Sequence, residues 1–352
     1  ILNKYITANG QCYGVGANLP RYCNVCVVGS NDLYEHPDIN DLAFIPAIKD
    51  GVVGCIADVG GFYSSARCDL AVPLDAWVPQ DQIAALLNAV LCVFRDFGNR
   101  AGRQKCRLMW LIDEMGIEKF REEVASRMPD KELKSEGTSM VDTSKPRRDY
   151  FGVHEQKQEG LNFVGVNVPV GRMLAEDMFE MARIAKEYGD GEMRLTVEQN
   201  VVFGNVPTDK LEAFQAEPLF QKFHINPGML SMGLVSCTGN QFCGFSNIET
   251  KAQAKNVTEQ LEATLALSKP VRMHWTGCPT TCGQVQLADI GLMGTKPKHE
   301  EGQMVEAVDI FLGGAIGHEA AIGEVWKANV ECTKLVPVLE ELLIEKFDAS
   351  RK

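Results

Sequence analysis

Two short loops in the last third of the chain hold four cysteines that could bind a soft metal. Five residues separate Cys237 from Cys243, three separate Cys278 from Cys282, and a glycine follows each pair. Thiolates are the usual ligands of iron–sulfur clusters, and glycine lets backbone N–H groups approach the sulfur atoms. The pattern therefore favours an iron–sulfur cluster at these two loops.

Other interpretations of the four cysteines stay open at this point. Structural zinc loops usually separate their ligands by two to four residues, often with histidine completing the set, and the five-residue spacing departs from that pattern. Buried free thiols are a second alternative, because cysteine often behaves as a small core hydrophobe. A disulfide framework is not expected in a chain that is long enough to form its own core.

Composition limits the class of protein. A length of 352 residues with 45% hydrophobic residues predicts two or three domains with an ample core. The net charge of −12 argues against nucleic acid or an anionic membrane as a partner. Twelve scattered cysteines favour a reducing compartment, and the sequence has no apolar run long enough to predict a transmembrane helix. Because the chain begins with Ile1, we expect a processed product or a fragment.

The elements that must position the cysteine loops are predicted from periodicity and from turn residues. In the first part, strands are expected at 25–28, 42–45 and 51–59. Helices are expected from Asp81, as N-cap, to a stop at Gly98, and then over 103–115 and 117–128. A polar stretch at 129–150 is typical of a linker.

The second part has the order of a ferredoxin-like unit. A strand over 161–168, a helix over 173–188, strands over 192–197 and 201–206, and a short helix capped by Thr208 give the order β-α-β-β-α. A long helix is predicted at 250–267, between the two cysteine pairs. The cysteine loops therefore follow a compact unit that contains no cysteine ligands of its own.

An internal repeat links the two ends of the chain. When the sequence is shifted by 248 positions, Gly29 aligns with Gly277, Ser30 with Cys278 and Tyr34 with Cys282, and Asp41 with Asp289. With five residues inserted, the Gly60-Gly61 pair aligns with Gly313-Gly314. We interpret this as an ancient duplication in which only the second copy kept the metal ligands.

These motifs resemble the siroheme- and [4Fe–4S]-containing nitrite and sulfite reductases, most closely the ferredoxin-dependent nitrite reductases of plastids and cyanobacteria. The resemblance covers almost the whole chain, and its specific motifs lie at 32–42, 194–200, 237–244 and 274–283. It implies an α+β fold of duplicated siroheme domains with a ferredoxin-like half-domain between them. The implied boundaries are 1–128 for the first repeat, 129–150 for the linker, 151–226 for the half-domain and 227–352 for the second repeat.

The resemblance also implies cofactors and their ligands. Cys237, Cys243, Cys278 and Cys282 would hold the [4Fe–4S] cluster, and Cys282 would also bridge to the siroheme iron. Siroheme carries eight carboxylates, so its pocket needs cations and N–H donors. The residues expected to line it are Arg194, Thr196, Gln199, Asn240 and Arg107. Arg107 belongs to a basic stretch with Arg103 and Lys105. For this basic stretch a solvated helix face stays an open alternative.

The loop before the first strand is implied to face the substrate. It reads Leu19-Pro20-Arg21-Tyr22-Cys23-Asn24, and the resemblance gives catalytic roles to Arg21, Tyr22 and Asn24. Asn24 favours nitrite, since the sulfite enzymes carry lysine there. Tyr22 stands where the family has a lysine, and a tyrosine can donate a proton but carries no positive charge for an anion.

The implied function is the six-electron reduction of nitrite to ammonia in nitrate assimilation, with reduced ferredoxin as electron donor. The alternatives are an assimilatory sulfite reductase and a truncated, non-catalytic cluster-binding electron-transfer module. The resemblance places the chain in the C-terminal two-thirds of the enzyme, without an earlier ferredoxin-like half, so one sheet edge is expected to be exposed. It further implies a monomer in a plastid stroma or a cyanobacterial cytoplasm, with basic residues near the cluster loops to dock an acidic ferredoxin.

Overall fold

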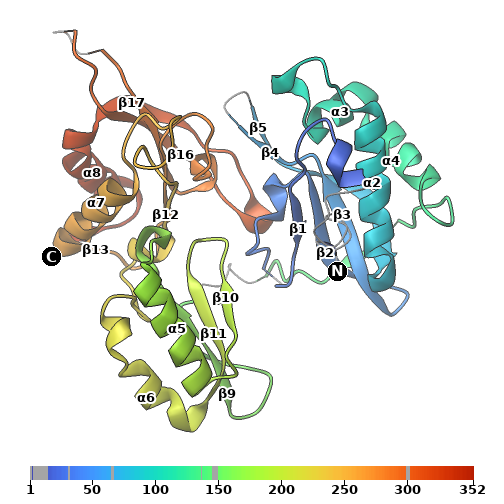
Figure 1. Ribbon diagram of the computed structural model, residues 1–352. Helices are drawn as coiled ribbons and strands as arrows, with labels where there is room; N and C mark the ends of the chain where they lie inside the picture. Colours follow the sequence, from blue (N-terminus) through green and yellow to red (C-terminus); the bar gives the residue numbers. More distant parts are fainter. Residues whose placement is uncertain are drawn as a thin grey trace. The chain divides into compact units, whose positions relative to one another are not determined.

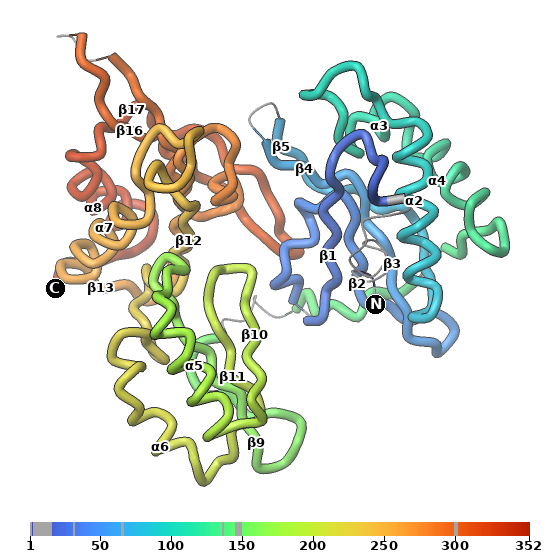
Figure 2. The backbone as a smooth tube through the Cα atoms, in the orientation of Figure 1, coloured from blue at the N-terminus to red at the C-terminus, as the bar shows by residue number. Residues whose placement is uncertain are grey.

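The computed structural model describes residues 2, 15–30, 32–64, 67–135, 137–144, 150–298 and 302–352. The chain folds into two compact units, which Figures 1 and 2 trace in sequence colours. Unit 1 comprises Ile1–Arg147 with Ile316–Ala320, and unit 2 comprises Arg148–Ala315 with Ala321–Lys352. Within the described ranges, none of the helices combines the length and the apolar character that crossing a bilayer demands.

Unit 1 is built on a sheet in the order β1-β2-β3-β6, in which β1 runs parallel to β2 and the other pairs are antiparallel. Its strands are β1 (Val25–Val27), β2 (Leu42–Lys49), β3 (Val52–Val59) and β6 (Val72–Pro79), with β7 (Thr138–Ser139) on β2 and a separate ribbon of β4 (Phe62–Tyr63) and β5 (Cys68–Asp69).

Three helices pack on one face of this sheet: α2 (Ile83–Phe97), α3 (Leu108–Met115) and α4 (Ile117–Ser126). Phe44, Leu74, Leu87, Phe94 and Phe120 are fully buried in one cluster between the sheet and the helices. Each fully buried side chain of this size stabilises the fold by roughly 1.5–3 kcal/mol relative to its exposed state, so this layer is the core of unit 1.

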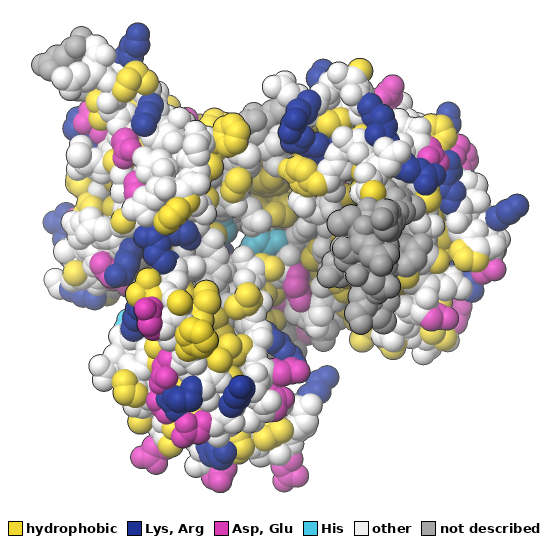
Figure 3. Space-filling view, in the orientation of Figure 1, with side chains coloured by type: hydrophobic (Ala, Val, Ile, Leu, Met, Phe, Trp, Pro, Cys, Tyr) yellow, Lys and Arg dark blue, Asp and Glu magenta, His cyan; other side chains and the backbone are white. Residues whose placement is uncertain are grey.

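Unit 2 begins with an antiparallel sheet in the order β10-β11-β9-β8. Its elements are β8 (Gly152–Glu155), β9 (Leu161–Val166), α5 (Ala175–Tyr188), β10 (Met193–Leu195), β11 (Val201–Pro207) and α6 (Leu211–Gln215). β10 forms one edge of this sheet, and Figure 3 shows hydrophobic side chains gathered over α5 and β10. Phe179 and Leu195 are each 79% exposed there, and an exposed apolar patch of this kind usually marks an interaction surface.

The second sheet of unit 2 has the order β12-β14-β15-β16-β17. Its elements are β12 (Leu234–Ser236), α7 (Lys251–Thr264), β14 (Met273–Thr276), β15 (Ile290–Thr295), β16 (Ala307–Leu312), β17 (Glu324–Glu331) and α8 (Leu335–Lys346), with a ribbon of β13 (Leu265–Ala266) and β18 (Ser350–Arg351). Trp275, Leu292 and Ile310 of this sheet are fully buried with Leu261 of α7 and Leu339 of α8.

The structure corrects several of the elements predicted from sequence. The helix expected from Asp81 begins at Ile83, after a 3-10 turn over Gln80–Gln82, and the side chain of Asp81 forms no cap bond. The helix expected over 103–115 begins only at Leu108. Strands β6 and β8 were not predicted. Both lie at sheet edges, where alternation is weak and proline is tolerated. Pro73 and Pro79 of β6 obscured its strand pattern in the sequence. Residues 129–135 and 137–144 of the expected linker include β7, which pairs with unit 1.

The internal repeat is visible in the strand register of the two units. Val25 pairs with Leu42 in unit 1, and Met273 pairs with Ile290 in unit 2, at the shift of 248 positions. In each unit this parallel pair continues into two antiparallel strands, a 3-10 turn and a helix. His36 (φ 55°) matches Gln284 (φ 57°), and each of them precedes a 3-10 turn in the left-handed conformation. The two loops therefore share one backbone path.

The first copy fills its loop with a carboxylate where the second has a glycine. Glu35 aligns with Gly283, and its Oε1 accepts hydrogen bonds from the backbone N–H groups of Gly29 (2.8 Å) and Ser30 (3.1 Å). Ser30 Oγ donates to the other carboxylate oxygen at 2.8 Å. In the second copy the N–H of Gly277, which aligns with Gly29, donates to Cys237 Sγ at 3.2 Å. A carboxylate thus satisfies in one copy the donors that face a thiol in the other.

We expect Glu35→Gln to lower the free energy of unfolding of unit 1 by about 1–2 kcal/mol, because an amide replaces a charged acceptor of three hydrogen bonds. Denaturant unfolding followed by tryptophan fluorescence measures the change. Glu122→Gln is the matched control, since Glu122 is exposed on α4. Equal stabilities of the two variants would contradict the role given to Glu35.

Candidate metal centre

The two cysteine loops leave the same edge of the second sheet of unit 2. β12 and β14 are parallel neighbours, with Ser236 opposite Trp275, so their carboxyl ends lie side by side. Cys237 directly follows β12, and Cys278 lies two residues beyond the end of β14. Loops at the carboxyl ends of parallel strands are where such sheets bind ligands. The strand pairing therefore brings together cysteines that are far apart in sequence.

Backbone hydrogen bonds tie the two loops to each other. The N–H of Cys237 donates to Trp275 O at 3.0 Å, and the N–H of Asn247 donates to Gly277 O at 2.7 Å. Within the first loop, the N–H of Cys243 donates to Gly239 O at 3.0 Å. Gly239 has φ 77°, and an added Cβ there would lie 2.8 Å from the backbone N of Thr250, so only glycine fits this approach.

The strand pairing and the hydrogen bonds between the loops bring the four cysteines into one region. Burial raises the pKa of the Cys282 thiol, and the charges of Cys237, Cys278 and Cys243 raise it further. Four thiolates this close repel one another, and binding to cationic iron relieves that repulsion. Among the described residues, no three His, Cys, Asp or Glu side chains converge on a single metal position. In a cubane each cysteine binds a different iron, so the four sulfurs need not converge on one point. The four cysteines fit a [4Fe–4S] cluster.

Of the residues expected to line siroheme in unit 2, three lie in β10 or directly after it and the fourth lies inside the first cysteine loop. Arg194, whose side chain is 73% exposed, lies in β10 with its guanidinium 3.6 Å from Glu192. Thr196 Oγ1 accepts from the N–H of Asn200 at 3.0 Å. Asn240, inside the cysteine loop, is exposed and donates to Glu306 at 3.2 Å.

Gln199 is engaged with the protein itself. Its amide donates to Ser236 O at 2.8 Å and accepts from the Ser236 N–H at 3.1 Å. Gln199 therefore bonds both backbone groups of the residue that precedes Cys237. Arg194 and Asn240 thus expose polar groups that could meet carboxylates. Gln199 instead bonds the backbone of the cysteine loop, and the siroheme contacts of all four residues stay predictions.

The residues expected to face substrate lie together in unit 1. Tyr22 is 55% exposed, and its ring lies under two guanidinium groups, with Arg21 Cζ 5.3 Å and Arg107 Cζ 4.2 Å from its centroid. Asn24 is exposed, and its backbone N–H donates to Asp41 Oδ2 at 2.7 Å. The loop thus presents cations, a phenol and an amide close together, which suits a small anion.

Arg107 has a different position from the one expected of a cofactor ligand. Its side chain is 5% exposed, and its Nε and Nη2 donate to Asp41 at 3.0 and 2.5 Å. Burial raises the pKa of Asp41, against the opposing effect of Arg107. The same carboxylate accepts the backbone N–H of Asn24, so Asp41 links Arg107 to the loop that was expected to face the substrate. Asp289 repeats this contact in unit 2, where it accepts the N–H of Arg272 at 2.7 Å.

Cations near the cysteine loops were expected, but the individual residues were not. Arg172 Nη2 donates to Gln241, inside the first loop, at 3.0 Å. Lys251 donates to Ser236 O at 3.0 Å, and the preceding Thr250 donates through Oγ1 to Cys237 O at 2.7 Å. The sequence carries a signal for the last two, because a threonine before a predicted helix is a typical N-cap and the next residue then lies in the first turn. Arg172 had no such signal.

The site and the fold together define an iron–sulfur type of cysteine site beside a ferredoxin-like sheet. The family model described as "Nitrite and sulphite reductase 4Fe-4S domain" matches residues 2–132 and 230–347, and "Nitrite/Sulfite reductase ferredoxin-like half domain" matches 154–220. The chain belongs to the nitrite and sulphite reductase family. The predicted family resemblance and the α+β fold class are thereby confirmed.

Individual relatives agree with this assignment. The chain is 55% identical to "Ferredoxin--nitrite reductase, chloroplastic" of Arabidopsis thaliana over 99% of its own length and 60% of that protein. It is 52% identical to "Ferredoxin--nitrite reductase" of Synechococcus elongatus over 100% of its length and 68% of that protein. The solved structure of Mycobacterium tuberculosis NirA protein matches with a TM-score of 0.89 and 29% identity, over 98% of this chain and 63% of that one. The chain thus spans about 60% of the plant relatives.

We expect Cys282→Ser to lose most of the iron that the chain binds, because an alcohol is a poor ligand for an iron–sulfur cluster. Cys26→Ser is the matched control: Cys26 is buried in unit 1, where its thiol donates to Glu35 O at 3.6 Å. Iron and acid-labile sulfide per chain measure the difference. Equal metal content in the two variants would overturn the ligand set.

Asp41→Asn should lower the free energy of unfolding by about 3 kcal/mol, because it leaves the buried Arg107 without its charged partner. Asp113→Asn is the comparison variant, since the ion pair of Asp113 with Arg67 is half-exposed and should contribute less than about 1 kcal/mol. Urea unfolding of both variants checks the prediction, which fails if the two losses are the same.

Proposed function

We propose that this chain forms part of a ferredoxin-dependent enzyme that reduces nitrite to ammonia with six electrons, using a [4Fe–4S] cluster and siroheme. The observation that carries the proposal is the meeting of Cys237, Cys243, Cys278 and Cys282 at the carboxyl ends of β12 and β14. The names of the plant and cyanobacterial relatives support the donor and the substrate. Nitrate assimilation is the pathway to which this reaction belongs.

The cofactors, when bound, supply one-electron transfer and an open iron position for the anion. The chain's own residues have three roles in the proposal. The four cysteines would hold the cluster, and Cys282 would also serve as a ligand of the siroheme iron. Arg194, Thr196, Gln199 and Asn240 line the siroheme, and the exposed Arg194 and Asn240 have polar groups open to its carboxylates.

In the substrate loop, Arg21 and Asn24 bind and orient the anion. Tyr22 donates protons through its phenol, because it has no cationic group to offer in place of the family's lysine. The two guanidinium groups around the ring place positive charge beside the phenol.

The relatives also support a donor and a location. Arg172 and Lys251 place positive charge near the first cysteine loop, where an acidic ferredoxin would deliver electrons. A chloroplastic or cyanobacterial location follows the names of the relatives. We propose the monomeric state on the resemblance alone.

A second candidate is a non-catalytic module that holds the cluster and transfers electrons. This role would need the four cysteines and the cluster but no siroheme. Absorption and EPR spectra with iron counts separate the two candidates. About five irons per chain with coupled siroheme bands support the enzyme, whereas about four irons without haem bands support the module.

Tyr22→Phe should lower kcat for nitrite at least about tenfold in the chain loaded with both cofactors, because it removes the proposed proton donor. Ammonia formation with reduced ferredoxin or a reduced viologen measures the rate. Tyr188→Phe is the control, since Tyr188 bonds Glu217 within the half-domain and has no role in the proposed proton transfer. An unchanged kcat in Tyr22→Phe would remove Tyr22 from the mechanism.

A further inference from the structure

Lys251 is a half-buried cation beside the first cysteine loop. It is the first residue of α7, and its Nζ donates to Ser236 O at 3.0 Å and to the carbonyl of Val170. Ser236 and Val170 are both buried, the first at the end of β12 and the second in the 3-10 turn before α5. The ammonium group is therefore held between the cysteine loop and the ferredoxin-like sheet.

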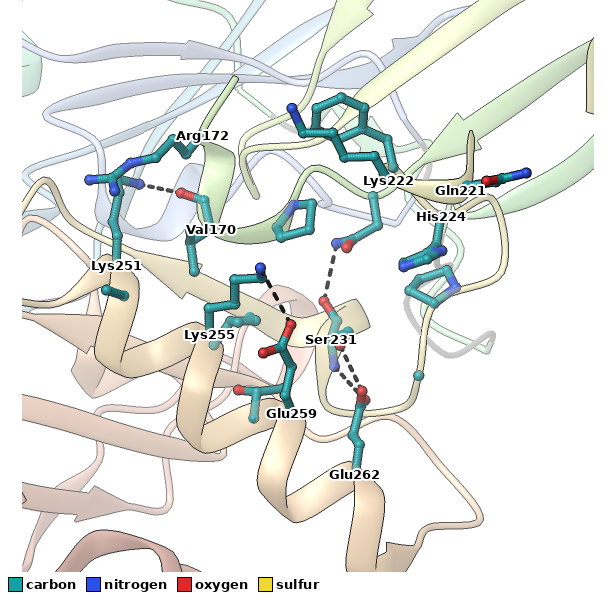
Figure 4. Close-up of a pocket in the computed structure, with 18 of the residues that line it drawn as sticks. Val170, Arg172, Gln221, Lys222, His224, Ser231, Lys251, Lys255, Glu259 and Glu262 are labelled. Carbon is teal, nitrogen blue, oxygen red and sulfur yellow. Dashed lines mark hydrogen bonds and ion pairs between the residues drawn. The ribbon is translucent and has the colours of Figure 1, made fainter. Parts of the chain in front are cut away.

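The charge of Lys251 lacks a carboxylate partner within the described part of the chain. Figure 4 shows Lys251 and Lys255 extending from the same helix among the residues that line a cavity. The volume of this cavity is about 730 Å³. Lys255 is paired with Glu259 at 3.5 Å, whereas Lys251 donates to the carbonyl of Val170. Carbonyl oxygens satisfy the N–H donors but do not neutralise the charge. Lys251 therefore forms no ion pair among the residues that the structure describes, and the carboxylate that acts on it is that of Glu249, two residues earlier in the chain.

The groups around Lys251 shift its pKa in opposite directions. Burial lowers the pKa of Lys251, and the neighbouring Arg172 lowers it further, whereas the charges of Cys237 and Glu249 raise it. Because Lys251 Nζ donates at 3.0 Å to the carbonyl of Ser236, the residue directly before Cys237, the ammonium lies beside the first cysteine of the proposed cluster site. In a partly dry site such interactions are stronger than in water.

Adding an electron to a cluster makes its already negative thiolate complex more negative. A [4Fe–4S] core of charge about 2+ with four thiolates carries a net charge of about −2 before reduction. A fixed cation beside one thiolate therefore stabilises the reduced form more than the oxidised form. Charges and hydrogen bonds around the sulfur atoms are known to shift the reduction potential of iron–sulfur clusters.

We propose that Lys251 is a positioning residue whose charge favours one-electron reduction of the cluster held by Cys237, Cys243, Cys278 and Cys282. Its two carbonyl contacts hold the ammonium beside the Cys237 loop, so that the ferredoxin-like sheet helps to set how readily the cluster accepts an electron. This inference rests on the proposed cluster site. It concerns the chain's capacity to accept each electron, whatever the later fate of that electron.

The test is a potentiometric titration of the full chain loaded with iron and sulfide, with dithionite as reductant and the EPR signal of the reduced cluster as readout. Lys251→Met should lower the reduction equilibrium constant about tenfold, which corresponds to a midpoint about 59 mV more negative for a one-electron couple. Lys251→Arg should keep the wild-type midpoint, because it preserves the charge. Lys251→Gln should behave like Lys251→Met.

Lys255→Met is the matched control one turn along α7. Lys255 is paired with Glu259 and its side chain is 53% exposed, so its loss should move the midpoint far less. Equal midpoints in Lys251→Met and the wild type, or equal shifts in Lys251→Met and Lys255→Met, would overturn the proposal. Loss of iron from both neutral variants at position 251 would also overturn it and leave Lys251 a purely structural role.

Iron content separates this inference from the proposed function. A wild-type chain that holds no cluster after loading would overturn the cluster site, and the role of Lys251 with it. A wild-type chain with about four irons whose midpoint is insensitive to Lys251→Met would overturn only the role of Lys251.

Discussion

The parallel pairing of β12 with β14 is the constraint on which the metal centre depends. Each strand has only a few residues, yet their register places Ser236 opposite Trp275 and starts both cysteine loops from one sheet edge. Three backbone bonds then fix the loops, and Gly239 and Gly277 allow close approach that a side chain would block. A slip of this pairing would separate Cys237 from Cys278, so the buried side chains of the sheet, led by Trp275, indirectly hold the ligand set.

Duplication explains why a second loop of the same shape lacks cysteine. Two features set the backbone path in each copy. The first is a left-handed residue, His36 in one copy and Gln284 in the other. The second is a carboxylate, Asp41 or Asp289, which accepts the N–H of the residue directly before the parallel pair of strands. These features need no metal. Glu35 satisfies the N–H groups of the first loop, so that loop needs neither a thiol nor a cluster as their acceptor.

The ferredoxin-like sheet does more than flank the cysteine loops. Gln199 grips both backbone groups of Ser236, Arg172 reaches Gln241, and Lys251 joins the turn at Val170 to the end of β12. Polar contacts of this kind between packed layers fix geometry more than they add stability, because each replaces bonds to water. They provide a physical route by which the sheet and the metal centre influence each other, although they lie in separate layers of unit 2.

The sequence by itself determined the ligand types, the order of the ferredoxin-like unit and the repeat, because spacing, glycines and periodicity are local properties of the chain. Through resemblance it also predicted that Asn24 and Tyr22 face the substrate, which stays a prediction. Only the tertiary structure decided which residues far apart in the sequence contact one another. Arg107 is turned inward onto Asp41, Gln199 bonds Ser236, and β6 and β8 become edge strands despite weak patterns. A buried charge takes its partner from whichever residue the fold brings within reach, and no local pattern specifies that residue.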